Sequence, residues 1–167
     1  IPKGTPMSDK APADTRVGHV HLKVTDLDRA IHFYTDVLGF ALTQRYGDRA
    51  AFLSAGNYHH HIGLNTRHSR GAGPAPVRAA GLYHVAFLFP DRASLGAALQ
   101  RVLDHGTPLD GAADHGVSEA VYFRDPDGNG VELYRDRDRA DWPRDGNGAL
   151  AMVNAPLDVQ ALLAEAV

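Results

Sequence analysis

The sequence contains no cysteine, and its charge is nearly balanced. Without cysteine there can be no disulfide framework and no thiolate metal site, so any metal must be bound through nitrogen and oxygen atoms. The formal net charge is only -3, and acidic and basic residues are interspersed along the chain. Such a distribution offers no basic surface to nucleic acid or to an anionic membrane. We therefore expect no nucleic-acid partner and no membrane partner.

Long hydrophobic runs are also missing from the sequence. No apolar stretch approaches the length of a membrane span, and the N-terminal IPKGTPMSDKAPADT lacks the hydrophobic region of a signal peptide. These absences predict a cytoplasmic protein. What remains, 44% hydrophobic residues in a chain of 167, is typical of one globular domain with a proper core. Histidine is unusually abundant, with 10 residues and a cluster at 59–61.

The first half of the chain follows one pattern of predicted elements. After a polar segment over residues 1–15, which we expect to be flexible, VGHVHLKV alternates like a half-buried strand. DLDRAIHFYTDVLGF then has the apolar spacing of a helix that ends at Gly39. Three strand-like runs follow, which are FALTQRYG, RAAFLSAG and YHHHIGLNTR. Residues 17–66 are therefore predicted to form a βαβββ module.

The second half, residues 81–136, repeats this pattern. LYHVAFLF predicts a strand, PDRASLGAALQRVLDHG a helix ended by Gly106, and TPLDGAADHG, VSEAVYFRD and NGVELYRD three more strands. The fold class predicted is α+β, with two tandem βαβββ modules that form a shared cleft within a domain of residues 16–139. Residues 140–167 form a C-terminal extension. Its APLDVQALLAEAV predicts a short helix, capped by Asp158, that packs on the domain or on a second subunit.

A duplicated module predicts equivalent positions in its two copies. His19 in GHVHLKV corresponds to His84 in YHVAFLF, and Gly63 in HIGLN corresponds to Glu132 in GVELY. Two imidazoles and one carboxylate are the ligand set of a facial triad, which suits Fe(II) with open positions. Taken singly, each residue fits an ordinary structural role, but together at equivalent positions they favour a metal site. His21 shares a strand face with His19 and is the alternative ligand.

These motifs resemble the vicinal oxygen chelate superfamily, which includes glyoxalases, fosfomycin and bleomycin resistance proteins and the type I extradiol ring-cleaving dioxygenases. The resemblance covers about residues 17–136. DLDRAIHFYTDVLGF is similar to the first helix of the superfamily, and DPDGNGVELY is similar to its closing hairpin, in which the glutamate is a metal ligand. The resemblance implies a metal bound by His19, His84 and Glu132. Fe(II) is the expected metal, and Mn, Zn or Ni would accept the same ligands.

Differences within the superfamily favour the dioxygenases. Glyoxalase I has a fourth, acidic ligand at the position where this chain has Gly63. In the ring-cleaving enzymes a histidine before a GVS stretch and a tyrosine shortly before DPDG flank the substrate, and DHGVSEAVYF matches these with His115 and Tyr122. A further family histidine stabilises oxygen at the iron. Counting back from IGLN matches it to His60, whereas strand alternation favours His61, which stays the alternative.

The resemblance therefore implies an extradiol dioxygenase similar to catechol 2,3-dioxygenases, acting on a small catecholic aromatic and dioxygen. It also implies a homodimer. Typical catechol 2,3-dioxygenases have four such modules, whereas this chain has two. Two alternatives stay open, a metal-dependent isomerase or lyase similar to glyoxalase and a small-molecule binding protein of the bleomycin-resistance kind.

Overall fold

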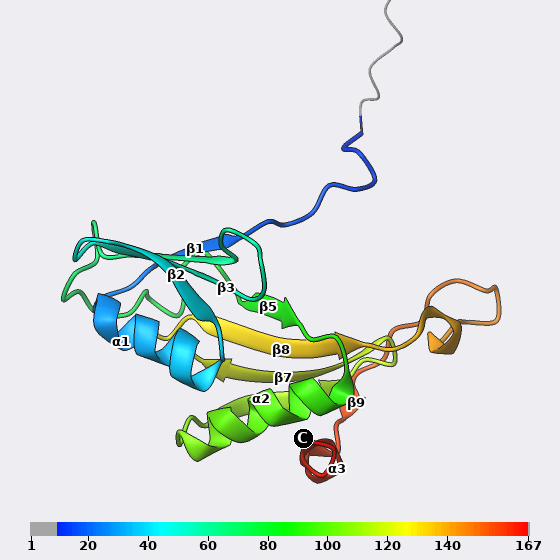
Figure 1. Cartoon of the computed structure of the whole chain (residues 1–167). Helices are drawn as coiled ribbons and strands as arrows, with labels where there is room; N and C mark the ends of the chain where they lie inside the picture. The colour runs from blue at the N-terminus through cyan, green and yellow to red at the C-terminus, as the bar shows by residue number, and fades with distance from the viewer. Residues whose placement is uncertain (1–9, 167) are drawn as a thin grey trace, which may run out of the picture.

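Two β-sheets, one from each half of the chain, form the framework of the protein (Figure 1). They are seen in a computed structural model that describes residues 10–166, so residues 1–9 of the segment predicted to be flexible lie outside the described residues. The first sheet has the order β1-β4-β3-β2 and the second has the order β5-β8-β7-β6-β9. The strands of the first sheet are β1 (Val20–Lys23), β2 (Ala41–Tyr46), β3 (Ala50–Ser54) and β4 (Ile62–Asn65). Those of the second are β5 (Val85–Leu88), β6 (Leu109–Asp114), β7 (Ser118–Arg124), β8 (Gly130–Asp136) and β9 (Ala155–Pro156).

Both sheets have the same internal pairing. In each, the first strand of the module pairs in parallel with the last, β1 with β4 and β5 with β8. The remaining neighbours pair antiparallel. A parallel pair needs a crossover connection, and a helix supplies it in both modules. The α+β class with two βαβββ modules, predicted from the internal repeat, is confirmed.

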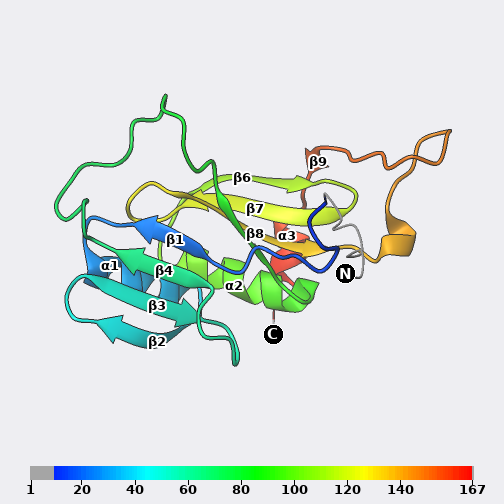
Figure 2. The ribbon, with the colours of Figure 1, turned by 90° about the horizontal axis from the view of Figure 1, so that it is seen from above.

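A helix crosses each sheet on the same side of the molecule (Figures 1 and 2). Helix α1 (Leu27–His32) continues as a π-helical turn, η1 (Phe33–Val37), and α2 runs over Arg92–Asp104. Asp26 and Asp91 cap the two N-termini, each accepting a backbone N–H of the first turn. The left-handed Gly39 and Gly106 follow the two helical segments, as predicted. The sequence spacing did not predict the π turn.

One apolar core lies between the sheets and these helices. Leu95, Leu99 and Val102 of α2 are fully buried in it, as their spacing predicts. The opposite sheet face is more open. On β1, for example, Leu22 is buried whereas His21 is exposed on the other face. The candidate functional side chains therefore lie on the face away from the helices.

The C-terminal extension returns to the second module. After the short η2 (Arg139–Asp141), β9 pairs with β6, an addition that the sequence did not predict. Helix α3 (Val159–Leu163) is capped by Asp158 as predicted, and it packs on α2. Gly96 of α2 permits this approach, because a Cβ there would lie 2.6 Å from the Leu162 carbonyl oxygen. Within residues 10–166, no helix has the length and apolar character needed to cross a membrane.

Candidate active site on the second module

Four of the predicted site residues meet on the open face of the second sheet. His84 Nε2 lies 2.9 Å from Glu132 Oε2. The Tyr122 hydroxyl lies 3.3 Å from Glu132 Oε1 and 2.8 Å from His115 Nε2. The four side chains thus form one continuous chain of contacts, from His84 directly before β5 to His115 directly after β6.

Strand register explains this convergence. Tyr122 on β7 stands directly opposite Glu132 on β8, so their side chains project from the same face. Ala86 pairs with Glu132 on the other side, and His84 lies two residues before Ala86 on the same strand face. The motifs that surround DPDG therefore converge because β6, β7 and β8 are neighbours.

Gly130 gives the segment that leads into β5 room to approach. A Cβ at Gly130 would lie 2.3 Å from the Tyr83 carbonyl oxygen and 3.0 Å from His84 Cβ. Any side chain there would displace the backbone that carries His84. Gly130 belongs to the predicted strand NGVELYRD, and a glycine inside a strand indicates close approach of another backbone.

The surroundings of Tyr122 keep its hydroxyl protonated. Burial, followed by the charge and the hydrogen bond of Glu132, raises the pKa of Tyr122 to about 12. Glu132 itself is only 9% exposed. At neutral pH the phenol is therefore a hydrogen-bond donor, with His115 and Glu132 as its two possible acceptors.

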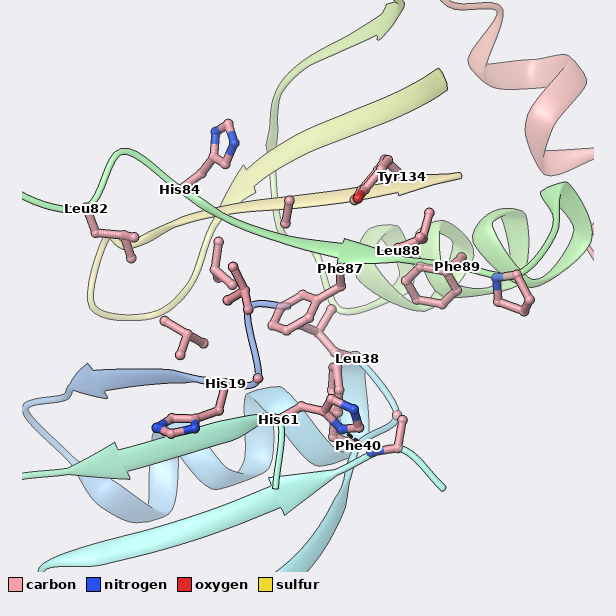
Figure 3. A pocket seen from close by; sticks show the side chains of 18 of the residues that line it. His19, Leu38, Phe40, His61, Leu82, His84, Phe87, Leu88, Phe89 and Tyr134 are labelled. Carbon is pink, nitrogen blue, oxygen red and sulfur yellow. Dashed lines mark hydrogen bonds between the residues drawn. The ribbon is translucent and has the colours of Figure 1, made fainter. Parts of the chain in front are cut away.

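His19 lies apart from this group. It comes from the first module, where its ring packs 4.5 Å from that of His60. A cavity of about 880 Å³ separates the modules, and both His19 and His84 line it. The two come from opposite sides of this cavity, with the ring of His84 pointing away from His19 (Figure 3). Across the described part of the chain, no three His, Asp or Glu side chains are grouped closely enough to hold one metal ion.

The register nevertheless makes His19 the counterpart of His84. In the first sheet His21 pairs with Gly63, just as Ala86 pairs with Glu132 in the second. His19 precedes His21 by two residues, as His84 precedes Ala86. The equivalence that the repeat predicts is thus present in the backbone, although the side chains of the two histidines do not meet.

His60 and His21 are the histidines of the first module that lie near His19. His60 lies between the rings of His19 and Phe52, at 4.5 and 5.0 Å. His61 directly precedes β4, and its Nδ1 lies 3.0 Å from Ser54 Oγ and 3.2 Å from the backbone nitrogen of Ala55. Burial, and then the charge of His19, lowers the pKa of both His60 and His21. Both effects favour the neutral form of these two imidazoles.

Comparison with known proteins identifies the family. Residues 16–133 match the model of the Glyoxalase/Bleomycin resistance protein/Dioxygenase superfamily. The chain belongs to this superfamily. It is 42% identical over 154 residues to a catechol-2,3-dioxygenase of Bacillus subtilis, covering 92% of this chain and 53% of the relative. It is 32% identical to biphenyl-2,3-diol 1,2-dioxygenase 3 of Rhodococcus globerulus, covering 72% of this chain and 63% of the relative.

Further relatives have the same length as this domain. A probable lactoylglutathione lyase of Vibrio cholerae is 27% identical, with 73% of this chain and 91% of the relative covered. A glyoxalase/dioxygenase structure from Nostoc punctiforme superposes with a TM-score of 0.65 at 20% identity, over 78% of this chain and 98% of that one. A lactoylglutathione lyase structure from Agrobacterium tumefaciens gives 0.56 at 27% identity, over 75% and 96%. This chain therefore spans about half to two thirds of the two dioxygenases and nearly all of the two lyases.

Proposed function

We propose that this superfamily member is a metal-dependent extradiol dioxygenase that opens the ring of a small catecholic aromatic with dioxygen. The observation that carries the proposal is the chain of contacts His84–Glu132–Tyr122–His115, which joins two proposed metal ligands to two groups able to handle protons. The 42% identity to a catechol-2,3-dioxygenase supports the same reaction class.

The proposed metal ligands are His19, His84 and Glu132. Two imidazoles and a carboxylate suit Fe(II), and Mn, Zn or Ni accept the same donors. A bound metal would supply the redox chemistry that ring opening requires. In the described structure only His84 and Glu132 are in contact, so the arrangement of side chains does not by itself fit a three-ligand centre. Binding through all three requires His19 to approach the pair, from the same chain or from a second copy.

Tyr122 and His115 are the proposed catalytic residues. The Tyr122 hydroxyl, kept protonated by its raised pKa, donates a hydrogen bond to a substrate oxygen. His115 Nε2, 2.8 Å from that hydroxyl, accepts or returns a proton at the same point. His60 of the first module is also proposed as a catalytic residue, which would stabilise the dioxygen substrate. His61 is the alternative for this role. The 370 Å³ pocket beside His84, His115 and Tyr122 is the proposed substrate site.

A glyoxalase-like isomerase or lyase is the second candidate. The Vibrio cholerae and Agrobacterium tumefaciens relatives favour it by length, because the match covers 91% and 96% of them. The fourth acidic ligand of glyoxalase I would stand at Gly63, however, where a Cβ would lie 2.9 Å from the His21 ring. A carboxylate side chain at that position requires His21 to move. The occupied space beside Gly63 therefore supports the dioxygenase over the lyase.

We also propose that the chain forms a homodimer. Leu82 and Leu88, which line the cavity between the modules, are 53% and 55% exposed, and Tyr83 beside Leu82 in the sequence is 86% exposed. Large apolar side chains exposed near one another favour an interaction site. Sedimentation equilibrium should give twice the chain mass, and a monomeric mass over a wide concentration range would reject the proposal.

Ring cleavage tests the proposed reaction directly. Protein reconstituted anaerobically with Fe(II) should consume oxygen and form ring-opened product with at least one member of a catechol panel. Tyr122→Phe and His115→Ala should retain metal but lose about 10²–10⁴-fold in turnover, as expected when a positioned proton donor or acceptor is removed. Thermal unfolding of the same preparations separates loss of fold from loss of catalysis. An iron-loaded wild type that cleaves no catechol, or full activity in both variants, would contradict the proposal.

A further inference from the structure

The C-terminal extension runs beside the candidate active site. It lies beyond the superfamily match, which ends at residue 133. Its strand β9 pairs with β6 in register with Ala113 and Asp114, immediately before His115. We refer to residues 150–156, which lead into and include this strand, as the arm. Asn154 of the arm lines the same pocket as His115 and Tyr122.

One residue of the arm bonds His115 twice. The Val153 backbone N–H donates to the His115 carbonyl oxygen at 3.0 Å. The Val153 carbonyl oxygen lies 3.2 Å from His115 Nδ1. Backbone and side chain of His115 are therefore both held by Val153, which is 38 residues away in the sequence.

The neighbouring glycine permits this contact. Gly116 has a left-handed φ of 74°, and a Cβ there would lie 2.7 Å from Pro143 Cγ and 3.2 Å from Val153 Cγ2. Pro143, together with Val153 of the arm, thus packs directly against the turn that carries His115. Only a residue without a side chain allows so close an approach.

The Val153 carbonyl determines which nitrogen of His115 bears the hydrogen. A carbonyl oxygen accepts hydrogen bonds and cannot donate them, so the bonded Nδ1 must carry the N–H. In a neutral imidazole, Nε2 then has a free lone pair, and this atom faces the Tyr122 hydroxyl at 2.8 Å. His115 Nε2 can therefore accept the Tyr122 proton, and it lies nearer to the hydroxyl than Glu132 Oε1 does, at 3.3 Å.

We propose that the arm is a positioning element, in which the Val153 carbonyl holds His115 in the Nδ1–H tautomer so that Nε2 accepts the proton of Tyr122. The catalytic value of this arrangement rests on the proposed function, but the tautomer itself does not. Val153 acts through His115 and is not in contact with the reacting atoms. Backbone carbonyl groups that accept a hydrogen bond from a functional histidine commonly fix its tautomer in this way.

Nitrogen NMR of 15N-histidine-labelled protein tests the tautomer without substrate. Long-range 1H–15N spectra of the neutral His115 imidazole should give a protonated Nδ1 and an unprotonated Nε2, with His115→Gln used to assign the signals. An Nε2–H tautomer in the wild type would overturn the proposal. Because no turnover is measured, this result is independent of whether the protein cleaves catechols.

Two variants link the arm to the tautomer. Val153→Pro removes the N–H that donates to His115, whereas the control Ala149→Pro removes an N–H at the loop tip that donates to Asp145 Oδ1 at 3.0 Å. Val153→Pro should shift the His115 signals toward the Nε2–H form and lower turnover about 10–100-fold. Ala149→Pro should change neither.

A backbone ester between Val153 and Asn154 provides a test that keeps every side chain. An ester carbonyl is a weaker hydrogen-bond acceptor than an amide carbonyl. The fraction of His115 in the Nδ1–H tautomer should therefore fall, as it should in Val153→Pro. An unchanged tautomer in both the ester and the folded Val153→Pro variant would contradict the proposed role of the arm.

Discussion

The hydroxyl of Tyr122 lies between two groups that compete for its proton, His115 and Glu132. The sequence could place all three residues near one another, because they flank one turn and DPDG fixes the hairpin. It could not reveal what holds them. The partner of His115 Nδ1 is Val153, and the space for His84 depends on Gly130. In both cases the two contacting segments lie far apart in the sequence, so no local sequence pattern predicts the contact.

The raised pKa of Tyr122 leads to a prediction on the metal-free protein. Tyrosinate absorbance, taken as the difference between wild type and Tyr122→Phe, should titrate near pH 12 rather than at the usual value of about 10. Since the folded state favours the protonated phenol, this stabilising contribution is complete below about pH 10 and is lost as the pH rises toward 12.

Glu132→Gln should lower that pKa, because the negative charge is removed while the burial remains. A wild-type titration near 10, or one that does not respond to Glu132→Gln, would mean that the Tyr122–Glu132 contact does not exist in solution.

At the scale of elements, the DPDG turn does more than close a hairpin. Asp125 in this turn accepts a hydrogen bond of 2.9 Å from Tyr34 in η1, and Asp127 accepts one of 2.9 Å from Arg29 in α1. The turn of the second module is therefore bound to the helix of the first. The apolar spacing of DLDRAIHFYTDVLGF predicts a helix that contains Tyr34, but the polar contact of its hydroxyl depends on how the modules pack.

Tyr34→Phe tests this link between the modules. Tyr34 is fully buried, and burial raises the pKa of its partner Asp125. Removing the hydroxyl leaves one less donor for a buried carboxyl group, which should cost about 1.5–3 kcal/mol of unfolding free energy. Denaturant unfolding measures this loss, with Tyr46→Phe, at a tyrosine that is 70% exposed, as the matched control. Equal stability of the two variants would contradict the predicted role of this bond.

At the scale of the whole molecule, the repeat in the sequence predicted the two modules and their equivalent positions. The residues on one strand face follow from a period of two, so the repeat correctly gave the register that relates His19 to His84 and Gly63 to Glu132. The distance between the two first strands does not follow from any such period. In the structure β1 and β5 belong to separate sheets with a cavity between them, and this separation leaves His19 beside His60.

Metal content is the measurement that tests the central claim most directly. Wild type, His19→Ala, His84→Ala and Glu132→Ala should be equilibrated anaerobically with Fe(II), dialysed and analysed for bound metal, with His32→Ala on the exposed surface of α1 as the control. We expect wild type and His32→Ala to retain the metal and each of the other three variants to lose it. Retention in His19→Ala alone would remove His19 from the site and leave His84 and Glu132 to bind with another ligand. Full retention in all three variants would contradict the proposed metal centre and the dioxygenase function that depends on it.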